Sequence, residues 1–471
     1  MTLHEDEGVV SMWGLQVLAG HLPYRDFVVY LSPLLAYLYG GAFWLFGSSV
    51  LVERLLDAVP IVGGAALLGL VGRAVLPASW AAAVALLWGV WLTAFLGYGP
   101  YHFWGPALVL AMTVALLGPA PRPALAGAAA AGGLLFDQAV LPAVAAGLLV
   151  AYLLNRSAGD AARFSAAPLG AGAVLTVALA ATGSLASFFD QTVGFTLGRY
   201  QRFNHLPFPW NPVLLADTLN WHSGPAAYWE FGMFWLLGVV VPVLIAAWTL
   251  LLLARRPAGL SPAAVLGLIS TGLFLSVFLA RFGGPVCWMA APLALVLAAL
   301  RLHRMLGEAG HGQARRLALS PVLVLLLAGL TPAPVGFWLS CSSNPGGPLA
   351  AVGSTAGSIC LRRPEADELR HVEQLLAGRP ADGVAFLPTS PGLYLLTGSI
   401  PATPSYWVLR DQIRPSELAW EEAAMTRSAA LVVYVADPDL DTGHPWAFDE
   451  FLTSNYVEAE GYPGIRVLRR P

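Results

Sequence analysis

The sequence predicts a helical protein that crosses a membrane many times and ends in a small α/β domain. Of its 471 residues, 57% are hydrophobic and only 11% are charged, and the mean hydropathy is +0.66. Soluble chains carry about 25% charged residues, so this composition is typical of a polytopic membrane protein. Charged residues return throughout residues 361–471, which marks a separate domain.

Ten apolar runs predict membrane spans, because a helix needs roughly 20 apolar residues to cross a bilayer. The fourth and fifth are short, since Phe136-Asp137-Gln138 interrupts one long run. A carboxylate in contact with lipid is costly, so we expect Asp137 at a helix break near the outer surface. The ten spans are expected near residues 55–72, 78–97, 104–119, 123–136, 138–154, 167–183, 234–254, 261–280, 285–301 and 317–338.

Arginines in the short loops predict the orientation of these spans. All 25 basic residues are arginine, and those of the short loops fall on one side, which the positive-inside rule assigns to the cytoplasm. Both termini then lie outside. A short polar N-terminus has nothing to carry it across the membrane and shows no signal peptide, so we expect that a first span ending just before His4 is missing from the sequence. The loop arginines are Arg73, Arg122, Arg156, Arg163, Arg255, Arg256, Arg301, Arg304, Arg315 and Arg316.

Composition divides the chain into a transmembrane part at 1–340, a linker rich in Gly, Ser and Pro at 341–360, and an extracytoplasmic α/β domain at 361–471. Residues 1–50 form an outer-face loop of the first part. In the last domain we expect helices over DELRHVEQLLAG and WAFDEFLTSNY, strands over GVAFLP and ALVVYVAD, and IRVLRR as an edge strand. Cys287 reads as a core residue, whereas Cys341 and Cys360 can pair if their side is oxidising.

The polar residues that packing explains least all map to the outer face. A carboxylate there can act as a general base, and arginines bind phosphate oxygens through paired hydrogen bonds. Transfer of a sugar from a phosphate-linked lipid carrier needs both groups. The catalytic candidates are Asp6 and Glu7, and the candidates for binding substrate or phosphate are Tyr24, Arg25, His102, Arg199, Tyr200, Arg202 and Arg281.

Structural interpretations compete with several of these candidates. Asp6 and Glu7 can cap the helix predicted over 8–20, whose apolar side chains fall on one face and suit the membrane interface. Arg25 and Asp26 can form a surface ion pair of little energetic value. Tyr24 suits an interfacial belt of aromatic residues, and His102 can be a loop residue without a ligand.

The order of these features resembles the GT-C class of integral-membrane glycosyltransferases. The branch most similar to it contains the bacterial protein O-mannosyltransferases and the aminoarabinose transferase of lipid A. Asp6-Glu7-Gly8 matches the acidic motif after the family's first span, and GHLPYRDF (20–27) matches the stretch that follows. FFDQTVGFTLGRYQRFNHLPFP (188–209) looks like the family's long later loop, and the YLLTG and SNY elements of the tail resemble its outer domain.

The resemblance implies that Asp6 is the catalytic base on the acceptor, and that Glu7 supports it or helps to hold a divalent metal ion. His102 is the other candidate ligand for such an ion, and no further cofactor is implied. Two departures stand out. Members often have Lys-Gln where this chain has Asp137-Gln138, and RFGGPVCW (281–288) lacks the acidic residue and histidine that often follow the arginine.

We therefore expect a hexosyl- or pentosyltransferase of the cytoplasmic membrane. It would move a sugar from a polyprenyl-phosphate donor to a lipid, glycan or protein acceptor at the outer face. Its partners would be this donor, this acceptor and the lipids of the membrane. The net charge of −3 gives no reason to expect nucleic acid as a partner. The alternatives are a transporter or lipid-carrier flippase, against which the charge-free spans count, and a non-catalytic cell-envelope assembly protein.

Overall fold

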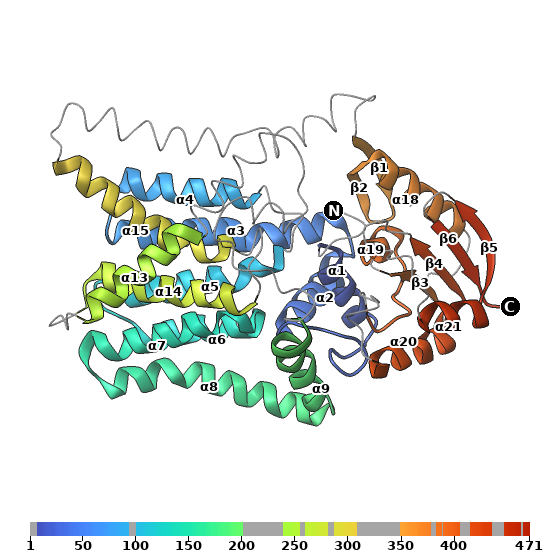
Figure 1. Cartoon of the computed structure of the whole chain (residues 1–471), viewed down its shortest axis with the longest axis horizontal. Helices are drawn as coiled ribbons and strands as arrows, with labels where there is room; N and C mark the ends of the chain where they lie inside the picture. Colours follow the sequence, from blue (N-terminus) through green and yellow to red (C-terminus); the bar gives the residue numbers. More distant parts are fainter. Residues whose placement is uncertain are drawn as a thin grey trace.

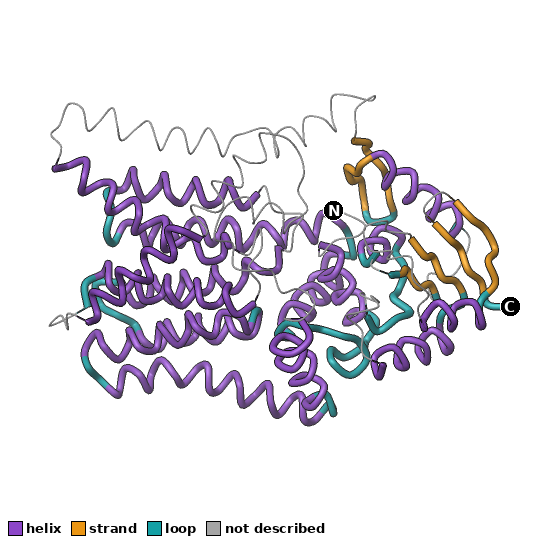
Figure 2. The backbone as a smooth tube through the Cα atoms, viewed as in Figure 1, coloured by secondary structure: helices purple, strands orange, loops and turns teal. Residues whose placement is uncertain are grey.

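The structure is a computed structural model, and it describes residues 7–93, 100–200, 239–254, 260–280, 287–308, 349–377, 383–388, 390–405, 415–435, 447–462 and 465–471. Three parts follow one another along its long axis (Figure 1). Long helices run side by side at one end, two shorter helices cross between, and a sheet with its helices forms the other end. In the described part, the strands belong only to this last region (Figure 2).

A helix covers every predicted span that falls within the described residues. The predicted span at 317–338 lies outside them. Three helical segments are long and apolar enough to cross a membrane, namely Val50–Arg73, Gln138–Asn155 and Ala158–Ala181. The long helices are α3 (Val50–Arg73), α4 (Ala78–Thr93), α5 (Trp104–Leu117), α6 (Pro123–Phe136), α7 (Leu141–Asn155), α8 (Ala158–Ala181), α13 (Val241–Ala254), α14 (Pro262–Ala280) and α15 (Cys287–Glu308).

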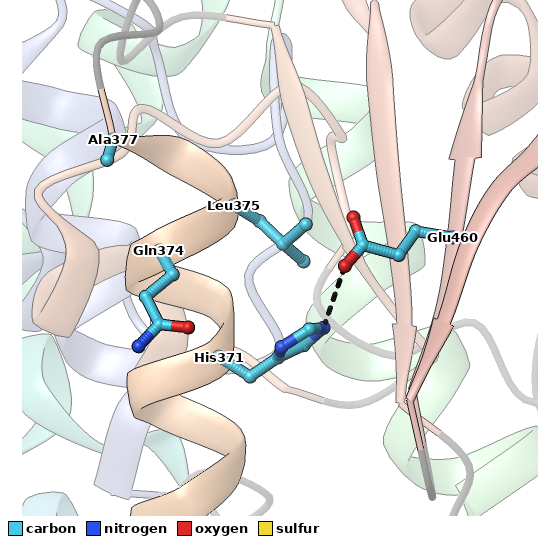
Figure 3. A pocket seen from close by; sticks show the side chains of 5 residues that line it. All are labelled: His371, Gln374, Leu375, Ala377 and Glu460. Atoms are coloured by element: carbon cyan, nitrogen blue, oxygen red, sulfur yellow. Dashed lines mark ion pairs between the residues drawn. The ribbon is translucent and has the colours of Figure 1, made fainter.

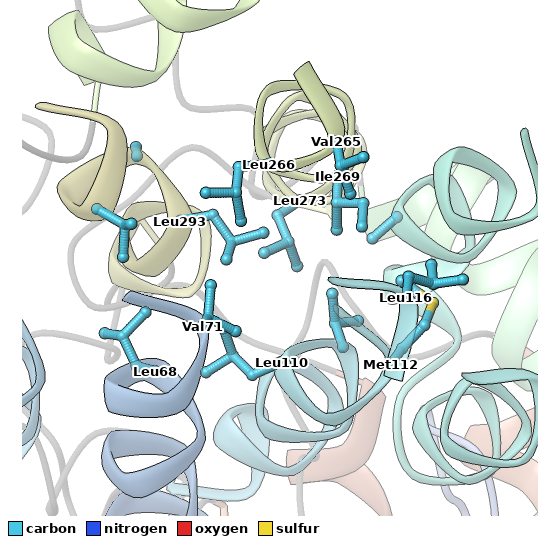
Figure 4. Packing of buried hydrophobic residues seen from close by; sticks show 14 of the residues in the cluster. Leu68, Val71, Leu110, Met112, Leu116, Val265, Leu266, Ile269, Leu273 and Leu293 are labelled. Atoms are coloured by element: carbon cyan, nitrogen blue, oxygen red, sulfur yellow. The ribbon is translucent and has the colours of Figure 1, made fainter. Parts of the chain in front are cut away.

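Aliphatic side chains of α3, α5, α14 and α15 fill the interior of this helical bundle (Figure 4). Glycine permits close approach elsewhere: a Cβ on Gly127 of α6 would lie 2.0 Å from the carbonyl oxygen of Phe164 in α8. Such small residues at helix contacts are typical of membrane bundles. The outward face of α8 exposes Leu169, Val174 and Val177, which is the pattern of a surface that faces lipid.

The two crossing helices are α1 (Glu7–Leu18) and α2 (Leu34–Phe46). The expectation that α1 lies in the interface with one apolar face is only half right. Val9, Val10 and Trp13 of the expected apolar face are buried and Leu18 is exposed, but every residue from Gly8 to Gln16 is buried. The opposite face is covered because the outer domain packs against it, which the sequence of this helix alone does not indicate.

The outer domain contains two sheets. Strands β1 (Leu349–Ser354) and β2 (Gly357–Arg362) form an antiparallel hairpin, so the expected linker, 341–360, contains β1 and most of β2. The second sheet has the order β3-β4-β6-β5, with β3 and β4 parallel and the other pairs antiparallel. Its elements are β3 (Val384–Leu387), β4 (Leu431–Val435), β5 (Val457–Tyr462) and β6 (Ile465–Arg469), with helices α18 (Arg363–Leu376), α19 (Gly392–Thr397), α20 (Pro415–Ser428) and α21 (Ala447–Asn455).

The prediction that IRVLRR is an edge strand is wrong. This segment is β6, which pairs with β4 on one side and with β5 on the other. The strand at that edge of the sheet is β5, and β3 lies at the other edge. The sequence of β5, VEAEGY, is exposed on both faces and has none of the apolar alternation that predicts a half-buried strand. Cys360 is disulfide-bonded, while Cys341, its expected partner, lies outside the described residues.

The outer domain docks on the crossing helices through backbone-level contacts. A Cβ on Gly8 would lie 2.3 Å from the backbone nitrogen of Gly392, so α1 and α19 touch main chain to main chain. Gln16 Nε2 donates to the carbonyl of Thr403 at 3.0 Å, and the amide of Val28 donates to the carbonyl of Pro404 at 2.7 Å. These contacts tie α1 and the segment that follows it to the outer domain.

We predict that Gly8→Ala and Gly41→Ala shift stability in opposite directions. The new methyl at position 8 meets the α19 backbone, and overpacking of this kind costs about 1–3 kcal/mol. Gly41 lies inside α2 with open space around it, so alanine there should add about 0.5–1 kcal/mol of helix stability. Thermal unfolding of the purified protein in detergent measures both shifts, and equal shifts would contradict the close contact.

A second prediction concerns Glu421 of α20, which is fully buried. Burial raises the pKa of its carboxyl well above the usual value, and Glu417 raises it further, while a hydrogen bond from the Ser405 amide opposes the shift. Above pH ~4.5 the folded state then keeps a proton that the unfolded state has released. The free energy of unfolding therefore falls as pH rises, by up to about 1.4 kcal/mol per pH unit.

Glu421→Gln removes this dependence, so we expect the variant to gain stability relative to the wild type between pH 5 and pH 8. The melting temperatures of both proteins at the two pH values test this. Glu422→Gln is the matched control, because the side chain of Glu422 is partly exposed on the same helix. A constant difference between Glu421→Gln and wild type would show that Glu421 is ionised in the folded protein.

Candidate functional site

The outer-face loop, residues 7–50, lies between the helical bundle and the outer domain (Figure 1). Asp6 lies outside the described residues, and Glu7 is the first residue of α1, with its side chain also outside them. Gly8 follows directly and rests against Gly392. The acidic motif therefore leads into the point at which α1 and the outer domain touch.

Two buried carboxylates of α3 accept hydrogen bonds from the crossing helices. Ser11 of α1 donates to Glu53 Oε1 at 2.5 Å, and the hydroxyl of Tyr39 in α2 donates to Asp57 Oδ1. Both carboxylates are fully buried and lie one helical turn apart. Neither was assigned a role from the sequence: the first expected span, 55–72, began after Glu53 and included Asp57 as one of its residues. The signal was present as a Glu and an Asp on one face at the start of an apolar helix.

Residues 22–33, which we call the juxtamembrane loop, connect α1 to α2. The loop turns tightly at Tyr24, whose backbone has a φ of +65° and whose amide donates to the carbonyl of Phe27 at 2.9 Å. The Tyr24 hydroxyl donates to the carbonyl of Leu31 at 2.6 Å, and burial raises its pKa well above the ordinary value. Tyr24 thus bonds within the loop and holds its shape.

Arg25 projects from the same turn and pairs with Asp26, as the alternative reading of this pair expected. Arg25 Nη2 lies 2.8 Å from Asp26 Oδ2, and half of the arginine side chain is exposed. The hydrogen bond from Arg25 lowers the pKa of the Asp26 carboxyl. Since this pairing uses two of the five N–H donors of a guanidinium, Arg25 can bind an anion while it stays paired.

Gln138 holds one half of the juxtamembrane loop. It begins the short helix η2 (Gln138–Val140), at the predicted break between α6 and α7. Its Oε1 accepts from the Ser32 amide at 2.9 Å and from the Ser32 hydroxyl at 3.2 Å, and its Nε2 donates to the Tyr30 carbonyl at 2.8 Å. The break in the helix therefore places the side-chain amide of Gln138 where it can hydrogen-bond to the backbone of the juxtamembrane loop.

Gln191 holds the other half of this loop from a different element. It lies in η3 (Asp190–Tyr200), a π-helical segment that continues α9 (Leu185–Phe189). Its Oε1 accepts from the Val29 amide at 3.0 Å, and its Nε2 donates to the Tyr24 carbonyl at 3.2 Å. Helices of the π type are rare and often occur at functional sites.

His102 lies next to the helix break, in the short helix η1 (Pro100–Phe103). Its Nδ1 is 3.6 Å from Asp137 Oδ2, and Asp137 is fully buried. Asp137 Oδ1 accepts from the amide of Ala139 and so caps η2. The imidazole of His102 and the carboxyl of Asp137 therefore face each other beside the helix break.

The remaining predicted site residues reach the limit of the described chain. Arg199 and Tyr200 are the last two residues of η3, with side chains outside the described part, and Arg202 and Arg281 lie outside it altogether. The structure thus brings together the loop of Tyr24 and Arg25 and the helical segment of Arg199 and Tyr200. His102 sits at the Asp137-Gln138 break, whose glutamine holds the same loop.

Among the residues that the structure describes, neither a cluster of metal ligands nor the pocket of the outer domain joins this group. Among the described residues, no three His, Cys, Asp or Glu side chains gather as metal ligands would. A hollow between α18 and β5 is lined by His371 and Glu460, whose Nε2 and Oε1 atoms are 3.9 Å apart (Figure 3). None of the predicted site residues lines this hollow, so it is a separate feature.

Comparisons with known proteins agree with this architecture. No protein-family profile and no curated protein sequence matches the chain. The crystal structure of ArnT from Cupriavidus metallidurans bound to undecaprenyl phosphate is similar over 99% of this chain and 94% of its own, at 13% identity and a TM-score of 0.58. The apo structure of the same protein is similar over 99% of this chain and 94% of its own, at 14% identity and a TM-score of 0.51.

An oligosaccharyltransferase from Archaeoglobus fulgidus, tethered to an acceptor peptide, is similar over 100% of this chain and 70% of its own, at 13% identity and a TM-score of 0.47. At these identities the likeness is one of fold. The ArnT match nevertheless covers the helical bundle, the crossing helices and the outer domain together. The chain has the fold of ArnT, and the resemblance to the GT-C class that its sequence predicted is confirmed at that level.

Proposed function

We propose that this protein transfers a sugar from a polyprenyl-phosphate donor to an acceptor at the outer face of the cytoplasmic membrane. One observation carries the proposal: the whole chain shares its fold with a structure of ArnT bound to undecaprenyl phosphate. The position of α1 supports it, because α1 joins the carboxylate motif at its start to the juxtamembrane loop, which carries the half-exposed Arg25.

In the proposed reaction Asp6 is the general base. It takes the proton of the acceptor hydroxyl while the hydroxyl oxygen attacks the anomeric carbon of the donor, and the bond from that carbon to the phosphate oxygen breaks. The configuration at the carbon inverts in this single displacement. Glu7 supports Asp6 or helps to hold a divalent ion, for which His102 is the other candidate ligand.

The phosphate that leaves carries the developing negative charge, and cations that surround it lower the barrier. Arg25, Arg199, Arg202 and Arg281 are the proposed cations, with His102 and the hydroxyl of Tyr200 beside them. Tyr24 acts from within the loop, because its hydroxyl already donates to Leu31. The sugar is a hexose or a pentose, and the acceptor is a lipid, a glycan or a protein.

We predict that Asp6→Asn abolishes this activity, since loss of a general base typically costs 10²–10⁴-fold. The test compares glycolipids and glycans by mass spectrometry in a deletion strain complemented with each variant. Wild type should restore a sugar-bearing species that the deletion lacks, and Asp6→Asn should not, although it inserts into the membrane equally well. Asp367→Asn, an exposed carboxylate of α18, is the matched control and should restore the species fully.

A further prediction concerns donor binding. Arg281→Ala should raise the KM for the lipid donor by about tenfold or more, because a hydrogen bond to a charged group contributes roughly 1.5–3 kcal/mol. The KM for the acceptor should change little. Arg163→Ala is the control, since Arg163 pairs with Asp160 on the predicted cytoplasmic side. Steady-state kinetics in proteoliposomes measure both constants, and an unchanged donor KM would remove Arg281 from the site.

A further inference from the structure

The juxtamembrane loop and the segment 185–200 touch at three successive points. The ring of Tyr24 packs edge-on against Phe188, with centroids 5.1 Å apart and planes at 90°. Gln191 then bonds to the backbone of Tyr24 and Val29. Further along η3, the ring of Tyr30 stacks on that of Phe195, with centroids 4.1 Å apart and an angle of 20° between the ring planes. Successive positions of the segment, 188, 191 and 195, thus contact successive positions of the loop, so the two pack together as one unit.

The same segment continues without interruption to Arg199 and Tyr200. Its first half is thus bonded to the juxtamembrane loop, and its last two residues are proposed to meet the donor phosphate. A helix transmits displacement along its axis, because its backbone hydrogen bonds resist local deformation. Any ligand that fixes the end of η3 therefore also fixes Gln191 and the backbone that it holds.

Gln138 offers a built-in comparison. Its side-chain amide also hydrogen-bonds to the backbone of the juxtamembrane loop, but it lies at the break between α6 and α7, and no helix runs from it to Arg199. Each glutamine follows an aspartate, at positions 137–138 and 190–191. One glutamine therefore anchors the loop to the bundle, and the other anchors it to the segment of the candidate donor site.

We infer that Gln191 is a positioning residue that couples occupancy of the lipid-phosphate site at the end of η3 to the position of the juxtamembrane loop. This inference rests on the proposed function only in assigning the phosphate to that end of the segment. Donor binding then orders the loop that carries Arg25, and through it the helix that follows Asp6 and Glu7. The catalytic carboxylates are aligned once the donor is present.

Hydrogen–deuterium exchange of the full-length protein in nanodiscs tests the coupling. The probe is undecaprenyl phosphate, and undecaprenol, which lacks the phosphate, is the matched ligand control. In the wild type, undecaprenyl phosphate should slow exchange of peptides from the loop by about fivefold or more, within the usual range of coupling between sites. Undecaprenol should leave these peptides unchanged.

The matched variants are Gln191→Met and Gln138→Met, which replace an amide with an apolar side chain of similar length. Both should speed exchange of the loop in the absence of ligand, at Val29 in the first and at Ser32 in the second. Only Gln191→Met should lose the protection that undecaprenyl phosphate induces. Phe195→Leu, which removes the stack on Tyr30, should reduce that protection while it keeps the amide.

Full ligand-induced protection in Gln191→Met would overturn the inference, and so would its absence in the wild type. If Gln191→Met fails to fold, Phe195→Leu decides, because undiminished protection in that variant has the same meaning. The outcome is independent of sugar transfer. A strain analysis that finds no missing sugar would refute the proposed function, yet protection by undecaprenyl phosphate would still support the coupling.

Discussion

The structure depends on satisfying the hydrogen bonds of an irregular backbone at the edge of a membrane bundle. Buried N–H and C=O groups must find partners, and little water is present there to supply them. The juxtamembrane loop meets this requirement with side chains from distant parts of the sequence: Gln138 bonds Tyr30 and Ser32, and Gln191 bonds Tyr24 and Val29. Replacement of either amide would leave backbone groups unpaired, so the two glutamines decide where the loop can sit.

The outer domain completes the same arrangement from the opposite side. Pro404 accepts from the Val28 amide, and Gly8 leaves room for the main chain of Gly392. The helix between these points is therefore enclosed by α2, by α3 through Glu53, and by the outer domain. Its register is fixed from Gly8 to Gln16, which is what the proposed base Asp6, just before its N-terminus, requires, because a misplacement of about 1 Å can cost 10²-fold in rate.

The sequence predicted the parts whose causes are local. Apolar runs placed the helices of the bundle, and the cost of a lipid-facing carboxylate placed a break at Asp137, where the chain does leave α6. Other features depend on partners far away in the chain. Nothing near α1 indicates that the outer domain covers its second face, and the acidic edge strand β5 forms only because β6 pairs with it. The grip of Gln191 on residues more than 160 positions earlier is likewise a property of the fold.

The Asp137-Gln138 pair shows how a departure from the resembling family can leave the architecture intact. The glutamine does the structural work, since all three of its hydrogen bonds go to the loop, while the residue before it points to His102. An aspartate in place of the family's lysine at position 137 therefore keeps the hydrogen bonds to the loop and places a carboxyl group beside His102. In the proposed reaction this removes one cation from the neighbourhood of the phosphate. Stabilisation of the leaving phosphate then depends on the arginines of the loop and of η3. The coupling between those two elements is therefore more important in this chain than where a lysine is present.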